Sequence, residues 1–177
     1  MGLLRVDRDQ PFRPDDLARS VLAMFSADAK QRGIEIRLQI DNSLAQMQAE
    51  TVKGDQNRLA QVLINLLTNA LRYTTEMSDH GTIDVRIRAT ATLPEARAGV
   101  MRIQSVDPAP DAVPADSVWL SVAVTDGGPG LSMEDQSRLF NRFAQANPKL
   151  DSVSGFGLGL FVSRKIIEVR DMQRHCD

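Results

Sequence analysis

The sequence has few of the residues that cross-link a chain or anchor it in a membrane. Its single cysteine, Cys176, cannot form an internal disulfide, so the composition favours a reducing compartment and we expect a cytoplasmic protein. No apolar run approaches the roughly 18 to 20 residues that span a bilayer, and the first residues lack the pattern of a secretory signal. We therefore expect no membrane segment in this chain.

An excess of positive charge is also absent. The net charge is −2 and the isoelectric point is about 5.7. Because binding to a nucleic acid backbone needs a basic surplus, nucleic acid is not an expected partner. The 177 residues, 42% of them hydrophobic, suit one domain with one core. Any polyanion that this protein binds must therefore be bound by a few residues close to it and not by an overall positive charge.

Hydrophobic periodicity gives the expected elements. Apolar residues at helical spacing predict helices at 14–32, 56–73, 132–143 and 158–169. Strict alternation predicts strands at 34–40, 82–88 and 118–125, and residues 100–106 are a further candidate. The Pro- and Asp-rich stretch 107–116 reads as a surface loop. Since the elements lack the regularity of βαβ units, we expect an α/β fold, a two-layer sandwich in which a mixed sheet packs on helices.

Two asparagines mark the strongest predicted helix. Asn65 and Asn69 stand four residues apart and therefore on one face, inside an apolar stretch. A lone buried asparagine is most often structural and satisfied by its neighbours. The pair has Arg72 and Tyr73 next to it, however, and an amide oxygen can bind Mg²⁺ while Arg72 meets a phosphate and Tyr73 offers a ring.

A carboxylate and several glycines follow the strand at 118–125. Asp126 and Gly127 alone would indicate a plain turn. The additional Gly128 and Gly130 indicate a place where the backbone approaches another group closely. An ionised aspartate only accepts hydrogen bonds, so it suits an exocyclic amino group such as that of adenine.

A second glycine cluster, at 155–160, leads directly into a predicted helix. Backbone N–H groups at such a helix start form a ready phosphate site. The cluster is not a Walker A loop, because no Gly-Lys-Ser/Thr follows, and it is not a Rossmann fingerprint, because it does not follow a strand of a βαβ unit. We therefore expect a nucleotide site of another kind.

Four segments, at 65–73, 126–130, 139–143 and 155–160, resemble in order and spacing the asparagine, first-glycine, phenylalanine and second-glycine boxes of sensor histidine kinase catalytic domains. That ATP-binding (Bergerat) fold is shared with type II topoisomerases and the ninety-kilodalton heat-shock chaperones. The resemblance covers roughly residues 14–168, and the phenylalanine box favours the kinases. It implies an ATP-binding catalytic domain at 14–169, between a linker at 1–13 and a divergent tail at 170–177.

The resemblance also implies roles for single residues. Asn69, helped by Asn65, would hold Mg²⁺ against ATP, and Arg72 would lie near a phosphate. Tyr73 would stack on the base, and Asp126 would accept a hydrogen bond from the adenine amino group. The residues that would let the nucleotide approach the backbone are Gly128, Gly130, Gly155, Gly157, Leu158, Gly159 and Leu160, under a lid at 144–154.

Three departures from the family pattern affect the expected activity. Gln61 stands where many members carry a glutamate, and an amide cannot act as a general base, which argues against a stand-alone ATPase. His80 and His175 are not placed as phosphoacceptors, so we expect a dimerisation domain of the same or another kinase to supply the histidine and a response regulator receiver domain to act indirectly. The tail lacks the family's last two strands, which indicates a truncated, divergent, frame-shifted or mis-spliced end. The alternative function is a non-catalytic remnant that binds nucleotide or other kinase chains.

Overall fold

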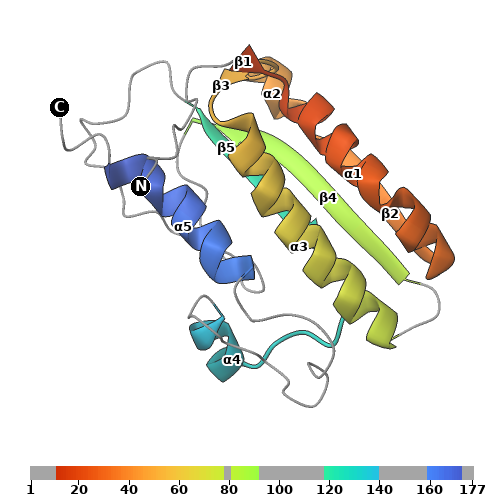
Figure 1. Cartoon of the computed structure of the whole chain (residues 1–177). Helices are drawn as coiled ribbons and strands as arrows, with labels where there is room; N and C mark the ends of the chain where they lie inside the picture. The colour runs from red at the N-terminus through yellow and green to blue at the C-terminus, as the bar shows by residue number, and fades with distance from the viewer. Residues whose placement is uncertain (1–10, 78–80, 92–117, 140–158, 173–177) are drawn as a thin grey trace, which may run out of the picture. The chain divides into compact units, whose positions relative to one another are not determined.

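A computed structural model describes residues 11–77, 81–91, 118–139 and 159–172 (Figure 1). The chain divides into two compact units. Unit 1 comprises Met1–Pro94 and Val118–Pro129, and unit 2 comprises Glu95–Ser117 and Gly130–Asp177. Unit 1 contains the sheet and the helix with the paired asparagines.

The sheet of unit 1 has the order β2-β4-β5, with β2 at Ile34–Ile40, β4 at Gly81–Thr90 and β5 at Trp119–Thr125. β2 pairs with β4 in parallel, from Ile34 opposite Gly81 to Ile40 opposite Ile87. β5 pairs with β4 in the antiparallel direction, and Thr125 at its end lies opposite Asp84. The sheet is therefore mixed, as the sequence predicts.

Helices α1 (Pro14–Gln31) and α3 (Gln56–Met77) pack on one face of this sheet (Figure 1). On β4, the side chains of Ile83, Val85, Ile87 and Ala89 are at most 2% exposed. The intervening side chains, such as Arg86, point to the other face and are more exposed. This alternation follows from the two-residue period of a strand, and it confirms the two-layer α/β sandwich.

Helix α1 shows how local sequence sets an element's ends. Pro14 occupies its first turn, where a missing N–H costs nothing. Arg13 donates hydrogen bonds of 3.2 Å to both carboxylate oxygens of Asp15, which holds the pKa of that carboxyl below its usual value. The helix ends at Gln31, and Gly33, with φ of +68°, turns the chain into β2.

Three short elements are not predicted by the sequence. β1 (Pro11–Phe12) pairs with β3 (Val52–Lys53), and a single helical turn, α2, spans Ser43–Gln46. Elements of two to four residues are too short to show a period. Phe12 is nevertheless 6% exposed and part of the core, although it lies in the stretch that we assign to a linker.

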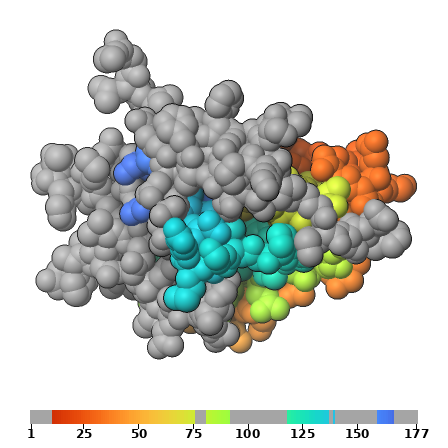
Figure 2. All heavy atoms as spheres, turned by 90° about the horizontal axis from the view of Figure 1, so that it is seen from below, coloured from red at the N-terminus to blue at the C-terminus, as the bar shows by residue number. Residues whose placement is uncertain are grey.

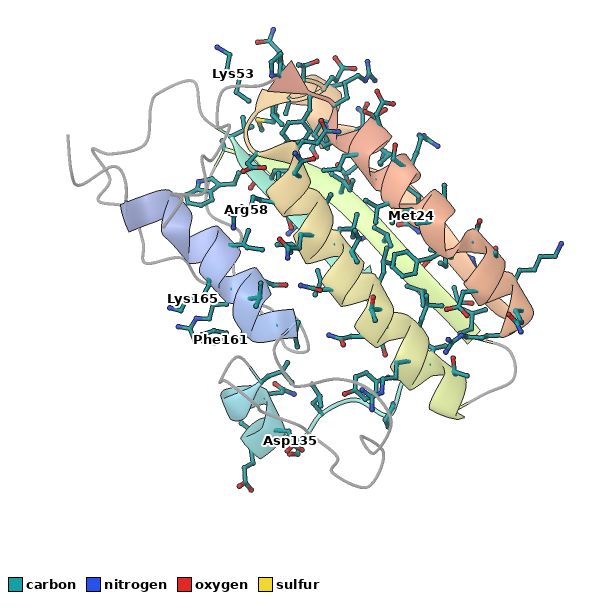
Figure 3. The ribbon with its side chains drawn as sticks, viewed as in Figure 1. Met24, Lys53, Arg58, Asp135, Phe161 and Lys165 are labelled. Atoms are coloured by element: carbon teal, nitrogen blue, oxygen red, sulfur yellow. The ribbon has the colours of Figure 1, made fainter. Side chains whose placement is uncertain are left out.

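Unit 2 contains α4 (Met133–Arg138) and α5 (Gly159–Met172). The Ser132 hydroxyl caps α4 by accepting a hydrogen bond of 3.1 Å from the Asp135 N–H. In α5, the Lys165 amine lies 5.9 Å from the centre of the Phe161 ring (Figure 3). The predicted strand at 100–106 lies outside the described residues. The predicted helix at 132–143 is too long: α4 ends at Arg138 with Leu139 as its C-cap, and residues 140–143 lie outside the described residues. Among the described residues, no helix is long and apolar enough to cross a membrane.

The start of β4 lies against the last turns of α3. A Cβ atom added to Gly81 would collide with Cγ2 of Thr74, whose side chain is buried. α3 continues to Met77, one turn beyond the predicted end, and this extra turn contains the buried Thr74.

We predict that Gly81→Ala lowers the free energy of unfolding by roughly 1 to 3 kcal/mol, the usual cost of overpacking. Thr74→Ser removes Cγ2 and should therefore recover most of that loss in the double variant. Urea unfolding of the two single variants and the double variant measures the coupling. Additive losses would show that the two groups do not collide.

Candidate functional site

The polar residues of α3 lie at the border of its buried face. Leu63, Leu67 and Ala70 are at most 5% exposed and hold the helix against the sheet. Asn65 and Asn69 are half-buried. The apolar packing therefore sets the rotation of α3 and leaves both amides within reach of solvent or a ligand.

The two amides differ in their surroundings. Asn65 has an interaction partner. Within the part of the chain that the structure describes, the Asn69 side chain has none. The half-buried Asn69 amide is therefore open to solvent or to a ligand, and among the described residues it makes no contact that would assign it a structural role. This difference favours a ligand role for Asn69 over Asn65.

The loop after β5 lies directly against α3. A Cβ atom on Gly128 would stand 3.0 Å from Cβ of Tyr73 and 3.4 Å from its carbonyl carbon. Only a residue without a side chain fits this approach. The fold thus brings together two predicted site segments that lie more than 50 positions apart in the sequence.

The same loop orients the carboxylate of Asp126. Its Oδ1 accepts a hydrogen bond of 2.8 Å from the Gly128 N–H. The expected turn at Asp126 is therefore present, as an aspartate turn of the kind common in loops. Asp126 itself is exposed. Its second oxygen can accept from an incoming donor, because a carboxylate offers more acceptor sites than one N–H uses.

A cation and a ring stand beside this loop. The Arg72 guanidinium carbon lies 5.7 Å from the centre of the Tyr73 ring, which is within the range of a cation–π contact. Both side chains are half-buried. In unit 1 the arrangement therefore combines a carboxylate, an aromatic ring, a guanidinium and a free amide.

The remaining glycines of the site differ in what they require. Gly130 has φ of +72°, a conformation that side-chain-bearing residues rarely adopt. A Cβ atom on Gly127 would meet nothing within 4 Å. The first-glycine box therefore depends on its second and third glycines and not on its first.

The second glycine cluster is described only at its end. Gly159 and Leu160 form the start of α5 in unit 2. Gly155, Gly157 and Leu158 lie outside the described residues, as do the lid at 144–154 and both histidines. A common pocket between α3 and these glycines therefore stays a prediction. A hollow of about 620 Å³ in unit 1 lies elsewhere, between α1 and β2.

Residues 54–175 match the family model described as "Histidine kinase-, DNA gyrase B-, and HSP90-like ATPase". The chain belongs to this family. Within it, the adaptive-response sensory kinase SasA of Prochlorococcus marinus (strain MIT 9313) is 33% identical over 138 residues, which are 78% of this chain and 28% of that protein. Probable histidine kinase 3 of Oryza sativa subsp. japonica is 24% identical over 183 residues, 89% of this chain and 17% of that protein. The chain thus spans less than a third of these curated relatives.

Solved structures agree with the family. The catalytic domain of histidine kinase ThkA superposes with a TM-score of 0.58 at 26% identity, covering 91% of this chain and 80% of that chain. Full-length ShkA in complex with AMPPNP gives 0.60 at 25% identity, covering 93% of this chain and 26% of that chain. The chain is a histidine kinase catalytic ATP-binding domain, and the resemblance seen in its four boxes is confirmed.

For this histidine kinase-like ATPase we predict that Gly128→Ala weakens ATP binding about ten- to hundredfold. The added methyl group would stand 2.7 Å from Oδ1 of Asp126 and 3.0 Å from Cβ of Tyr73, so the loop must move. Overpacking of this kind costs about 1 to 3 kcal/mol, and about 1.4 kcal/mol corresponds to a factor of ten in affinity. Gly127→Ala is the matched control, because its methyl group meets no atom within 4 Å. Equal affinities of the two variants for a fluorescent ATP analogue would contradict the close approach.

Proposed function

We propose that this chain binds Mg-ATP and acts as the catalytic module of a two-component sensor histidine kinase. In this role it transfers the γ-phosphate of ATP to a histidine on a separate dimerisation domain. The observation that carries the proposal is the close contact of Gly128 with Tyr73, which holds the Asp126 carboxylate beside an aromatic ring on α3.

The adenine base is bound by the residues around this contact. The Asp126 oxygen that is not used by the Gly128 N–H accepts from the exocyclic amino group of adenine. The ring of Tyr73 stacks on the base, and Arg72, whose guanidinium carbon lies 5.7 Å from the centre of that ring, binds a phosphate. Gly128 and Gly130 keep the backbone free of side chains where the base approaches.

The metal is held by neutral amide oxygens. Asn69 is the principal ligand, because its half-buried side chain has no partner among the described residues. Asn65, one turn earlier on α3, assists it. Mg²⁺ keeps several waters and shares the phosphates of its nucleotide, so one or two protein ligands are sufficient. When bound, the ion neutralises charge on the triphosphate.

The phosphates are bound at the start of α5. The second glycine cluster, comprising Gly155, Gly157, Leu158, Gly159 and Leu160, offers backbone N–H groups at the positive end of a helix of 14 residues. The lid at 144–154 closes over them. Transfer of the γ-phosphate then depends on positioning of the reactants and on neutralisation of the phosphate charge, which supply most of the catalysis in phosphoryl-transfer enzymes.

The nucleophile comes from another domain. His80 and His175 are the only histidines of the chain, in polar stretches near residues 78–80 and at the tail. Gln61 on α3 is exposed and carries an amide, so it cannot activate water as a base. By the family resemblance, the phosphate acceptor is a dimerisation domain and a response regulator acts further along the relay. The similarity to sensory kinases such as SasA supports a kinase role for the chain.

We predict that Asn69→Ala weakens Mg-ATP binding much more than binding of ATP in EDTA, because the partner of this amide is the ion and not the base. Titration calorimetry with and without Mg²⁺ measures both affinities. Thr68→Ala, at an exposed neighbouring position on α3, serves as the control. If the Asn69 variant lost the same affinity in both buffers, the metal role would be wrong.

The whole proposal is tested by phosphotransfer. Incubated with labelled ATP, the chain alone should remain unlabelled, and a purified dimerisation domain from a related kinase should gain acid-labile label when the chain is added. Replacing the acceptor histidine of that domain with glutamine is the control and should abolish labelling. Label on the chain alone would refute the need for a second domain. Nucleotide binding without any transfer would instead support the non-catalytic remnant.

A further inference from the structure

Unit 1 also has a hollow away from the proposed nucleotide site. A hollow of about 620 Å³ lies between α1 and β2, and apolar side chains including Leu22, Ala23, Ile36 and Leu38 line it. Within the described part of the sheet, β2 lies at one edge and β5 at the other. In Figure 2 the atoms of this part of the chain, in orange, form exposed surface. None of the lining residues belongs to the proposed nucleotide site.

The outer edge of β2 offers free backbone groups to this hollow. At the end of the parallel ladder, the Asp41 N–H donates to the Ile87 carbonyl at a distance of 2.9 Å. Backbone groups of successive residues face alternate sides of a strand, so those of Ile36 and Leu38 face away from β4. Among the described residues, no strand pairs with that side of β2. Such an edge is a template for one more strand.

The charges around the hollow are positive. Arg19 and Lys30 of α1 line it, and neither has a carboxylate partner in the described parts of the chain. The one acidic residue in the lining, Glu35, is bonded to Arg37 at 2.6 Å. The two cations are eleven positions apart, which is about 16 Å along a helix.

We propose that this hollow binds an extended acidic segment of a partner protein, which adds to β2 as a strand. Main-chain hydrogen bonds to Ile36 and Leu38 give the affinity, and side chains facing the helix layer give the selectivity. Those side chains recur every second residue, and two that are four residues apart lie about 13 Å apart. The segment therefore has the pattern acidic-x-apolar-x-acidic, with its carboxylates reaching Arg19 and Lys30 and its apolar residue reaching Leu22.

An amphipathic helix fits this surface less well, because it would leave the backbone groups of Ile36 and Leu38 without partners. A nucleic acid would find two cations but also a mainly apolar lining. The extended peptide is the one occupant that uses the edge, the apolar lining and both charges together.

A labelled peptide Thr-Glu-Thr-Val-Thr-Glu-Thr provides the test, with binding to the full chain followed by fluorescence polarisation. Saturable binding is expected, and the peptide with lysine in place of both glutamates should bind at least tenfold more weakly. N-methylation of alternate amides tests strand addition. One set of alternate amides should abolish binding while the other set leaves it intact, because only one edge of the peptide faces β2.

Variants of the chain locate the site. Arg19→Glu combined with Lys30→Glu should lower the affinity for the acidic peptide at least tenfold and raise the affinity for the lysine peptide. Lys53→Glu, a single charge reversal at an exposed position on β3 outside the hollow, is the control for Arg19→Glu and Lys30→Glu tested one at a time, and it should bind like the unaltered chain (Figure 3). Absence of saturable binding to the unaltered chain, equal affinities for the two peptides, or equal losses from both N-methyl sets would each overturn the proposal.

Discussion

The approach of the Gly128 backbone to Tyr73 is the contact on which the proposed nucleotide site depends. It joins the end of the sheet to the helix that carries the asparagines. It forms only when the register of β5 on β4 and the position of α3 on the sheet are both correct. β5 ends at Thr125, opposite Asp84, so the chain leaves the sheet with Asp126 as the next residue. A register shift of one residue would turn the strand over and move this carboxylate away from α3.

The position of α3 is in turn set by packing. Leu67 is fully buried against the sheet, and Thr74 lies so close to Gly81 that no Cβ atom would fit between them, which limits how far the helix can slide. Because cores are packed as densely as organic crystals, such contacts leave few alternatives. The packing of the apolar residues of α3 thus determines where its polar residues lie. Because the apolar residues hold the helix in place, the asparagines can lie half-buried at the edge of the core without contributing to its packing.

The sequence predicts the long elements well and the short ones poorly. The ends of β2 agree with its alternation, residue for residue, since Gly33 and Asp41 bound it on either side. β1 and β3 have two residues each and show no period, so the burial of Phe12 could not be inferred. For the site, the glycines after Asp126 indicate a close approach, but they do not say to which group. That Tyr73 is this group follows only from the register of the sheet. Roles that involve the second glycine cluster remain predictions, because most of it lies outside the described residues.

The central claim is that adenine is selected by the carboxylate that this contact holds in place. Its most direct test is titration calorimetry of the chain with Mg-ATP and Mg-GTP, before and after Asp126→Asn. Guanine has a carbonyl oxygen where adenine has its amino group, so the chain should bind ATP and discriminate strongly against GTP. The substitution should weaken ATP binding by about 1 to 3 kcal/mol and reduce the difference between the two nucleotides. Unchanged ATP affinity and unchanged selectivity in the Asp126→Asn variant would contradict the account.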